Sequence, residues 1–352
     1  MHKIRVMIVD DSAFMRQLID RILAKHEAVE VVARAGNGME ALEKIKQNKV
    51  DVITMDVEMP GMNGLEALKQ IMSTKPTPIV MISSFTKNGA METIEALNVG
   101  AVDFITKPSN ILDLGTRQFE TELIEKITVA YKARLKSCTP YRQSNERVYG
   151  DAGIGSSPIR SLIAVGASTG GPRALQEVVP VIPGCLEGAV LIVQHMPPEF
   201  TKSLAERLDT LSQIRVKEAE NGEIIKSGYC YIAPGGLHMR VIQGKRDREY
   251  LIKLDRGEPV SGHRPSVNVL FESLSMVDIE KAVAVIMTGM GSDGARGIEK
   301  LKQERGWMTI AQDEDTSVVF GMPGSAIKLG AIDKITALCN IGKEILKSLE
   351  VS

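Results

Sequence analysis

Short apolar runs alternate with amphipathic helical patterns through the first third of the chain. In the first helical pattern, Phe14, Leu18 and Ile22 recur at i, i+4 and i+8, with Met15 and Ile19 beside them. The strand-like runs are IRVMIVD, VEVVARA, VDVITMD, TPIVMISS and AVDFITKP. Continuous apolar runs separated by amphipathic helices are typical of a parallel sheet covered on both faces. About five such units in roughly 130 residues predict a flavodoxin-like doubly wound domain with a five-stranded parallel sheet.

A polar stretch interrupts this alternation after a helical pattern over residues 116–136. The residues that follow are rich in Gly, Ser and Pro and have little apolar periodicity, which is typical of a linker. Strand-like runs resume at Ile159 as SLIAVGAS, AVLIVQH, KAVAVIMTG and WMTIAQ. We therefore predict a first domain over 1–132, a linker over 133–158 and a second domain over 159–352.

The rhythm of the second domain changes between its second and third apolar runs. Residues 215–234 and 237–255 have the pattern of antiparallel strands joined by glycine turns. The prediction for this domain is an α/β fold with a parallel sheet and an antiparallel hairpin insertion.

Composition narrows the class of protein. A length of 352 residues suffices for two cores, and a formal charge of −1 argues against a dedicated nucleic-acid binder. The four cysteines form no C-x-x-C pair, which fits a reducing compartment without disulfides or a zinc site. The first apolar run is too short for a signal peptide, and no later run is long enough to span a bilayer. We expect a cytoplasmic protein without membrane insertion.

Polar residues follow four strands of the first domain. Asp10 and Asp11 end the first strand, Asp56 the third, Ser83 the fourth and Lys107 the fifth. Ligands bind at the carboxyl ends of the strands in open α/β sheets. Three carboxylates gathered there need a cation, and oxygen ligands suit Mg²⁺, while the lysine and the hydroxyl are suited to hold a phosphoryl group on one carboxylate. The structural alternative is that residues 10–12 cap the next helix and that Lys107 and Pro108 form a plain strand exit, and the joint placement disfavours it.

The segments that carry these residues resemble one family. VDDS, TMDVEMPGMNG, VMISS and FITKP are similar to the response-regulator receiver family over residues 1–130. The resemblance implies that Asp56 is the phospho-acceptor and that Asp10 and Asp11 bind Mg²⁺ with it.

The same resemblance assigns the switch residues. It implies that Ser83 and Lys107 contact the phosphoryl group, and that Phe104 is the switch aromatic. Phenylalanine has no hydroxyl, so we expect packing rather than a hydrogen bond to drive its reorientation.

Two glycine-rich turns in the second domain are candidate sites. Residues 166–170 match G-x-S-x-G, the strand-to-helix elbow that exposes a serine, here Ser168. The motif is weak alone, because Ser168 or Thr169 could equally be the N-cap of a helix that begins near Pro172. The turn lacks Gly-Lys-Ser/Thr and the G-x-G-x-x-G spacing, so it is a poor phosphate loop.

The second turn, residues 289–294, fits G-x-G-x-x-G literally. It follows an apolar strand, precedes a helical pattern and has Asp313 about twenty residues further on, as in dinucleotide-binding loops. However, Asp293 would place a carboxylate against a pyrophosphate, and the like charges would repel. A carboxylate at this position is better explained by a cation or an imidazolium beside it.

An imidazole is available from His195, which ends the apolar run that follows the Ser168 turn. Ser168, His195 and Asp293 end different predicted parallel strands, so they can meet at one sheet edge as an acyl-transfer constellation. Their chain order differs from the Ser…Asp…His of α/β-hydrolases. Spacing alone leaves a structural role for them equally open. His238 and His263, in loop-like contexts, are rival bases.

Six segments of the second domain, taken together, resemble the chemotaxis protein-glutamate methylesterase (CheB) family over about residues 159–345. They are VGASTGGP, VQHMPPEFT, IAPGGLHM, GHRPSV, TGMGSDGARG and AQDEDTSVVFGMPGSAI. One departure is Asn268, where an aspartate is common, and we expect it to contact no member of the serine–histidine–aspartate set.

The resemblance implies a reaction. Ser168 would attack a glutamate γ-methyl ester on a methyl-accepting chemotaxis receptor, with His195 as the base and Asp293 orienting the imidazole. The Met290 amide, with help from Thr169, would hold the oxyanion. The esterase reaction would need no cofactor, and the same acyl intermediate would permit deamidation of particular receptor glutamines.

The resemblance also implies regulation. The chemotaxis histidine kinase would phosphorylate the first domain, which otherwise acts as a lid over the esterase cleft. The chain is expected to be a monomer in the cytoplasm, associated with chemoreceptor clusters. Two other classes remain open from the sequence: a nicotinamide-dependent reductase that uses residues 289–294, and a non-catalytic binding module gated by the first domain.

Overall fold

The chain divides into two compact units, and the boundary follows Leu135. The computed structural model describes residues 3–107, 117–133, 159–246 and 248–350. The predicted linker, apart from its first residue, lies outside the described residues. No helix in the described part of the chain is long and apolar enough to cross a membrane.

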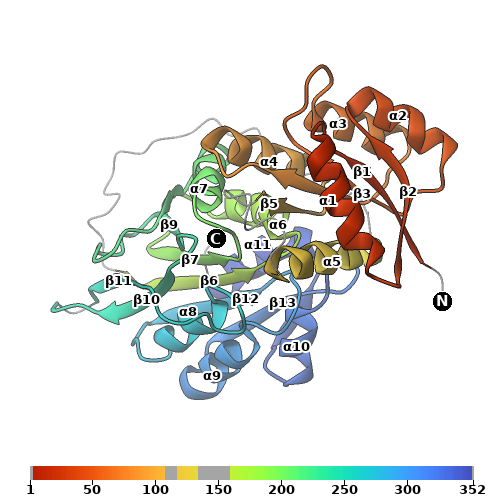
Figure 1. The fold of residues 1–352 in the computed structure, drawn as a ribbon. Helices are drawn as coiled ribbons and strands as arrows, with labels where there is room; N and C mark the ends of the chain where they lie inside the picture. The colour runs from red at the N-terminus through yellow and green to blue at the C-terminus, as the bar shows by residue number, and fades with distance from the viewer. Residues whose placement is uncertain (1–2, 108–116, 134–158, 247, 351–352) are drawn as a thin grey trace. The chain divides into compact units, whose positions relative to one another are not determined.

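The first unit is the predicted five-stranded parallel sheet, in the order β2-β1-β3-β4-β5 (Figure 1). Its strands are β1 (Ile4–Val9), β2 (Val29–Ala35), β3 (Val52–Asp56), β4 (Ile79–Ser83) and β5 (Asp103–Thr106). Its helices are α1 (Ala13–Ala24), α2 (Gly38–Gln47), α3 (Gly64–Thr74), α4 (Lys87–Val99) and α5 (Arg117–Lys132). Every residue of β3 and β4 is buried, because helices cover the sheet on both faces.

Side-chain caps fix where these helices begin. The Ser12 hydroxyl accepts a hydrogen bond from the Met15 amide at the start of α1. Asn63 and Glu66 form a capping box at the start of α3. Each cap lies just beyond a strand end, so it also sets the loop that carries the acidic residues.

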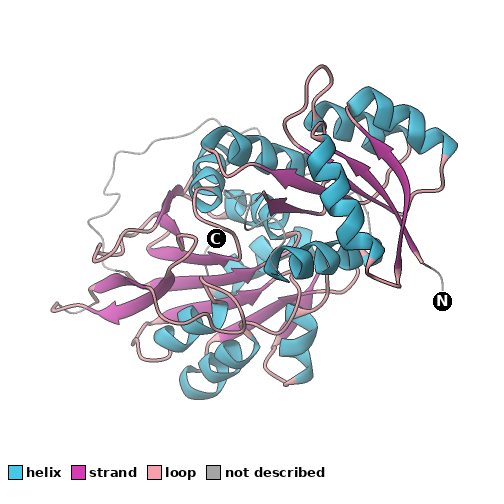
Figure 2. Cartoon of the chain, in the orientation of Figure 1, coloured by secondary structure: helices cyan, strands magenta, loops and turns pink. Residues whose placement is uncertain are grey.

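The second unit has a seven-stranded parallel sheet and a separate antiparallel hairpin (Figure 2). The sheet strands, in spatial order, are β14 (Lys334–Thr336), β13 (Met308–Gln312), β12 (Lys281–Ile286), β6 (Ser161–Ala167), β7 (Gly188–Gln194), β9 (Tyr229–Ile232) and β8 (Arg215–Glu218). The hairpin is β10 (His238–Gln243) and β11 (Tyr250–Asp255). The helices are α6 (Gly171–Val178), α7 (Phe200–Leu211), α8 (Val267–Leu274), α9 (Ala295–Arg305), α10 (Met322–Lys328) and α11 (Leu338–Ser348).

One predicted strand pairing is wrong. The segment 215–234 was expected to form antiparallel strands, but β8 and β9 are parallel and extend the main sheet. The connection between them runs back antiparallel to β11, where Ile224 bridges Leu251 and the Ile225 amide donates to Tyr250 O at 2.8 Å. The chain therefore re-enters the sheet at the end where β8 began, and β9 lies between β8 and β7. The predicted β10–β11 hairpin is confirmed.

The centre of this sheet positions the candidate site. Strands β6 and β12 are neighbours, and the connections that follow them run to opposite sides, to β7 and to β13, which creates a switch point (Figure 1). Every residue of β6 and β7 is buried. Polar residues at their carboxyl ends are thus carried by the most rigid part of the domain.

Candidate phosphorylation and catalytic sites

The acidic residues of the first domain gather at one sheet edge. Ligand oxygens of Asp10, Asp11 and Asp56 all lie within 4.8 Å of one another. Lys107 Nζ lies 2.6 Å from Asp56 Oδ2 and 3.3 Å from Asp10 Oδ2. Apart from this ion pair with Lys107, Asp10 Oδ2 is buried and accepts no hydrogen bond recorded among the described residues. A buried carboxylate oxygen of this kind is what a hard cation such as Mg²⁺ binds, so the residues fit the metal.

Burial dominates the ionisation of this cluster. It raises the pKa of Asp56 to about 6, against the opposing effect of the Lys107 ammonium. Burial also raises the pKa of Asp10. For Lys107, burial acts to lower the pKa, but the Asp56 and Asp10 carboxylates outweigh it and the net direction is upward. The site therefore holds excess negative charge that one lysine only partly compensates.

The two switch residues are buried, and neither interacts with Asp56 by a hydrogen bond that the structure records. Ser83 Oγ donates to Gly89 O at 3.1 Å. The Phe104 ring is 3% exposed, with Lys126 Nζ 5.2 Å from its centroid. The Ser83 hydroxyl is therefore bonded to the backbone of α4 in this structure.

In the second domain, Ser168 lies in the turn between β6 and α6. Its amide donates to Thr288 O at 3.0 Å, and its carbonyl accepts from the Gly171 amide at 2.7 Å. Helix α6 has Gly170 as its N-cap, in the left-handed conformation and without a side-chain cap hydrogen bond. The alternative in which Ser168 or Thr169 caps this helix is therefore wrong.

The glycine at the start of the second turn allows close approach to the serine. A Cβ on Gly289 would lie 2.7 Å from Ser168 Cβ. Gly294, with a φ of 89°, lies where a Cβ would be 2.6 Å from Val267. These two glycines thus have packing roles, and the third, Gly291, has a φ of 80°, so the G-x-G-x-x-G spacing is explained without a dinucleotide.

A short hydrogen bond joins the histidine to the carboxylate. His195 Nε2 lies 2.8 Å from Asp293 Oδ2, and both side chains are nearly fully buried. Among the described residues, His195 Nδ1 is buried without a hydrogen-bond partner. The His195 amide donates to Ala167 O, next to Ser168. The ring therefore has one nitrogen committed to the carboxylate and the other available for proton transfer.

Four donors surround the Asp293 carboxylate. Besides His195 Nε2, the Val267 amide donates to Oδ2 at 2.7 Å, while Ser266 Oγ and the Asn268 amide donate to Oδ1 at 2.8 and 3.1 Å. Burial acts to raise the pKa of Asp293, but these hydrogen bonds outweigh it and the net direction is downward. The carboxylate also lies at the N-terminus of α8, where the helix dipole favours a negative charge.

The expectation for Asn268 is corrected by this geometry. Its backbone amide does contact Asp293, a member of the proposed set. Its side chain faces elsewhere, with Oδ1 accepting from the Gly297 amide at 2.8 Å at the start of α9. An amide oxygen serves this bond as a carboxylate would.

A buried glutamine connects the serine turn to the histidine. Gln194 Nε2 donates to Ser168 O at 2.9 Å and to His195 O at 3.2 Å. Gly171 permits this approach, since a Cβ there would lie 2.0 Å from Gln194 Oε1. Sequence reasoning missed Gln194, although its position immediately before His195 was a usable signal.

The predicted oxyanion residues lie on either side of a second polar network. Thr288 Oγ1 donates to Thr169 O at 2.9 Å, and the Thr288 amide donates to Gln312 Oε1 at 2.8 Å. Met290 is 40% exposed, and the structure records no acceptor for its amide within the described part of the chain. An amide left unpaired next to the Gly289–Ser168 contact is a suitable donor for an incoming oxygen.

The rival histidines are not both in loops. His238 begins strand β10, is 1% exposed and has its Nε2 2.9 Å from Glu258 O. His263 is in a turn, and its ring stacks on that of His195. Ser266 was also missed, although it directly precedes helix α8, where hydroxyl residues are common.

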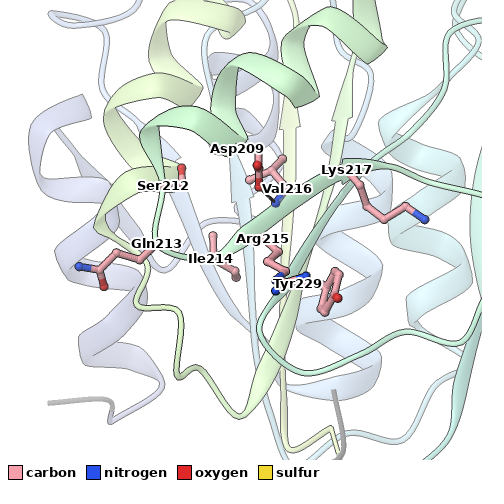
Figure 3. Close-up of a pocket in the computed structure, with 8 residues that line it drawn as sticks. All are labelled: Asp209, Ser212, Gln213, Ile214, Arg215, Val216, Lys217 and Tyr229. Carbon is pink, nitrogen blue, oxygen red and sulfur yellow. Dashed lines mark hydrogen bonds between the residues drawn. The ribbon is translucent and has the colours of Figure 1, made fainter. Parts of the chain in front are cut away.

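A pocket lies away from these residues, at the outer edge of the sheet (Figure 3). It has a volume of about 380 Å³ and lies where α7 is followed by β8. Its lining residues are Asp209, Ser212, Gln213, Ile214, Arg215, Val216, Lys217 and Tyr229. It contains no member of the serine–histidine–aspartate set.

The five-stranded sheet with its acidic edge, followed by a second α/β unit, is the architecture of a response regulator with an attached effector domain. Comparisons with known proteins agree. The model of the response regulator receiver domain matches residues 6–117, and the model of the CheB methylesterase matches residues 163–345. The chain belongs to the CheB methylesterase family.

Relatives match along nearly the whole chain. A protein-glutamate methylesterase/protein-glutamine glutaminase of Geobacillus kaustophilus is 46% identical over 347 residues, covering 99% of both chains. One of Archaeoglobus fulgidus is 46% identical over 351 residues, covering 99% of this chain and 98% of the relative. The crystal structure of the Thermotoga maritima CheB methylesterase catalytic domain is 40% identical and covers 55% of this chain and 98% of that one, with a TM-score of 0.51.

Proposed function

We propose that this protein hydrolyses glutamate γ-methyl esters on chemoreceptors and deamidates particular receptor glutamines. The names of its relatives, protein-glutamate methylesterase/protein-glutamine glutaminase, support the ester and amide chemistry. The observation that carries the proposal is the His195–Asp293 pair beside the Ser168 turn. The reductase alternative loses its support, because packing contacts account for Gly289 and Gly294 and a φ of 80° accounts for Gly291.

The catalytic cycle follows from the protonation of the imidazole. Asp293 accepts from Nε2–H of His195, so Nδ1 is the basic nitrogen. Ser168 Oγ attacks the ester carbonyl as Nδ1 takes its proton. The imidazolium, stabilised by Asp293, gives this proton to the methoxy group, and methanol leaves. Water then attacks the acyl-enzyme through the same base, which regenerates Ser168 and leaves glutamate. A glutamine substrate would release ammonia in place of methanol.

Backbone donors would stabilise the tetrahedral intermediates. The Met290 amide is available, and Thr169 next to the nucleophile is the second candidate. The Thr169 carbonyl accepts a hydrogen bond from the Thr288 hydroxyl, which holds this part of the turn before substrate arrives. A single preorganised donor is commonly worth a factor of about 10²–10³ in kcat.

The first domain would control this activity through Asp56, phosphorylated by the chemotaxis histidine kinase. Asp10, Asp11 and Asp56 would hold Mg²⁺, which supplies positive charge against the phosphoryl oxygens when bound. The Lys107 ammonium would leave its contact with Asp56 to bind the added phosphoryl group. Ser83 would bind a further oxygen of that group.

Repacking at Phe104 would pass the change on. When Ser83 Oγ leaves Gly89 O, the end of β4 and the start of α4 lose a constraint, and the buried ring can shift under Lys126. Domains over 1–132 and 159–352, with a linker over 133–158, would let the first domain act as a lid. Phosphorylation then shifts a population, and its effect is bounded by the differential stability of the two states.

The lid proposal has a separate test. Removal of residues 1–135 should raise basal esterase activity. Unchanged or lower activity in the folded fragment would contradict the lid and leave the esterase proposal intact.

The proposed substrate determines where in the cell the protein acts. A chemoreceptor substrate would place the chain, as a monomer, in the cytoplasm at receptor clusters. The proposed reaction is tested by mass spectrometry of receptor peptides after incubation of methylated receptor membranes with the protein. The account predicts conversion of methyl glutamate to glutamate by the wild type and none by Ser168→Ala. Unconverted peptides with the wild type would refute the proposal.

A further inference from the structure

The imidazole of His195 is covered on one face by the imidazole of His263. The ring centroids are 3.8 Å apart and the ring planes are inclined by 11°. His263 thus belongs to the surroundings of the base, although it is remote from it along the chain. Its contact is made through the face of the ring, which is not the contact of an acid or a base.

The hydrogen bond to Asp293 does not by itself fix the plane of the base. Nε2 lies nearer to the line of the Cβ–Cγ bond than Nδ1 does, so rotation about this bond displaces Nδ1 further than Nε2. Torsions of this type have broad minima. A parallel ring at 3.8 Å resists the rotation, because turning either ring would drive its edge into the other.

A tight turn places His263 at this position. The Val260 amide donates to His263 O and the His263 amide donates to Val260 O, at 3.1 and 3.0 Å. Ser261 and Gly262 between them both have positive φ, of 54° and 81°. Two such residues form the type of turn that closes a two-residue hairpin, so the ring projects from a defined backbone.

Residues 256–264, here called the strap, are anchored at several points. The buried His238 donates from Nε2 to Glu258 O at 2.9 Å. Arg264 Nη1 donates to Gly257 O at 3.0 Å, and Arg264 O accepts from the Gly236 amide. The strap is therefore tied both to itself and to the β10–β11 hairpin.

The strap leads directly into the residues that hold the carboxylate. Ser266, three residues after His263, donates to Asp293 Oδ1, and Val267 donates to Oδ2. One continuous stretch of chain thus determines both neighbours of the His195 ring. A displacement of the strap would move the stacked ring and the carboxylate together.

We propose that His263 is a positioning residue that holds the plane of the His195 imidazole so that Nδ1 faces Ser168. The inference rests on the esterase function proposed above. It assigns the effect of His263 on His195 to the planar ring that stacks on the imidazole.

The experiment compares three substitutions in the full chain by methanol release from methylated receptor membranes. His263→Ala and His263→Leu should lower kcat by about three- to tenfold, the range of an aromatic pair, with KM unchanged. His263→Phe restores a planar ring without a nitrogen and should recover most of kcat. His26→Ala, on the exposed surface of the first domain, is the matched control and should leave kcat unchanged.

Each outcome has one meaning. An unchanged kcat in His263→Ala would overturn the positioning role while the esterase function stands. A Phe variant as slow as the Leu variant would also overturn it, because a planar ring would then not suffice. A rise in KM with unchanged kcat would assign His263 to substrate binding. Absence of methanol release by the wild type would instead refute the esterase function. Thermal unfolding midpoints equal to that of the wild type establish that the variants are folded.

Discussion

Replacement of Asp293 by asparagine separates the charge of this residue from its hydrogen bonds. The amide has one oxygen, so its NH₂ group must face one of two pairs of donors. At the Oδ2 position it would meet the Val267 amide at 2.7 Å and force His195 Nε2 to accept. At the Oδ1 position it would meet Ser266, whose hydroxyl can turn to accept, and the Asn268 amide at the longer 3.1 Å. The second orientation is favoured, and it keeps the productive tautomer of His195.

The expected loss of activity in Asp293→Asn is therefore the loss caused by removing the negative charge of Asp293. An imidazolium and a carboxylate with centres about 4 Å apart interact by about 4 kcal/mol at an effective dielectric constant near 20. This corresponds to a loss of about 10³ in kcat for Asp293→Asn. A forced change of tautomer would cost about 10⁴. One donor left facing a donor should also lower the free energy of unfolding by about 1–3 kcal/mol.

The assay is kcat for methanol release, with ¹⁵N chemical shifts of His195 reporting which nitrogen carries the proton. Asp333→Asn is the matched control, since Asp333 also accepts from a backbone amide, at Thr309, but contacts none of the proposed catalytic residues. A loss smaller than tenfold in Asp293→Asn would refute the reasoning. A proton on Nδ1 of the neutral ring would refute the predicted orientation of the amide.

Three further predictions concern other contacts. Phosphorylation of Asp56 by acetyl phosphate should slow as the pH falls through about 6, because the protonated carboxyl is not a nucleophile. Isotopic labelling measures the rate, and a rate independent of pH would contradict the prediction. Gly289→Ala should reduce methanol release about 10²-fold, since its Cβ would displace Ser168; activity within threefold of the wild type would count against that contact. Ser266→Ala should raise the pKa of Asp293 and lower the free energy of unfolding by about 1–3 kcal/mol. Denaturant titration measures the stability, and unaltered stability would show that the Ser266–Asp293 hydrogen bond is dispensable.

Matched substitutions support these measurements. Gly36→Ala introduces the same methyl group in the first domain, where a Cβ would make only ordinary contacts, and should leave methanol release unchanged. Asp56→Asn should abolish the labelling at every pH, which assigns the titration to this residue.

Most of the architecture could be predicted because parallel strands buried on both faces give long apolar runs. The runs that contain β3, β4, β6 and β7 stand out for this reason. The parallel pairing of β8 with β9 could not be predicted in this way. It depends on Ile225, whose amide bonds to β11 and reverses the chain, and no local pattern reports that contact.

The residues of the candidate sites were predictable to the extent that they end strands. Ser168, His195 and Asp293 share one sheet edge by topology, and the structure gives the hydrogen bond between the last two. Gln194 and Ser266 had local signals, as the residues directly before His195 and before α8, but their partners are distant in the chain and were not predicted. Their roles arise from tertiary geometry, which the spacing of residues in one chain does not encode.

The central claim is that the Ser168 hydroxyl, activated by His195, cleaves receptor methyl esters. The measurement that tests it most directly is methanol release from methylated receptor membranes by the full chain, with and without acetyl phosphate. The account predicts release by the wild type, faster with the phosphodonor, and none by folded Ser168→Ala or His195→Ala under either condition. Release by Ser168→Ala at the wild-type rate, or no release by the phosphorylated wild type, would contradict it.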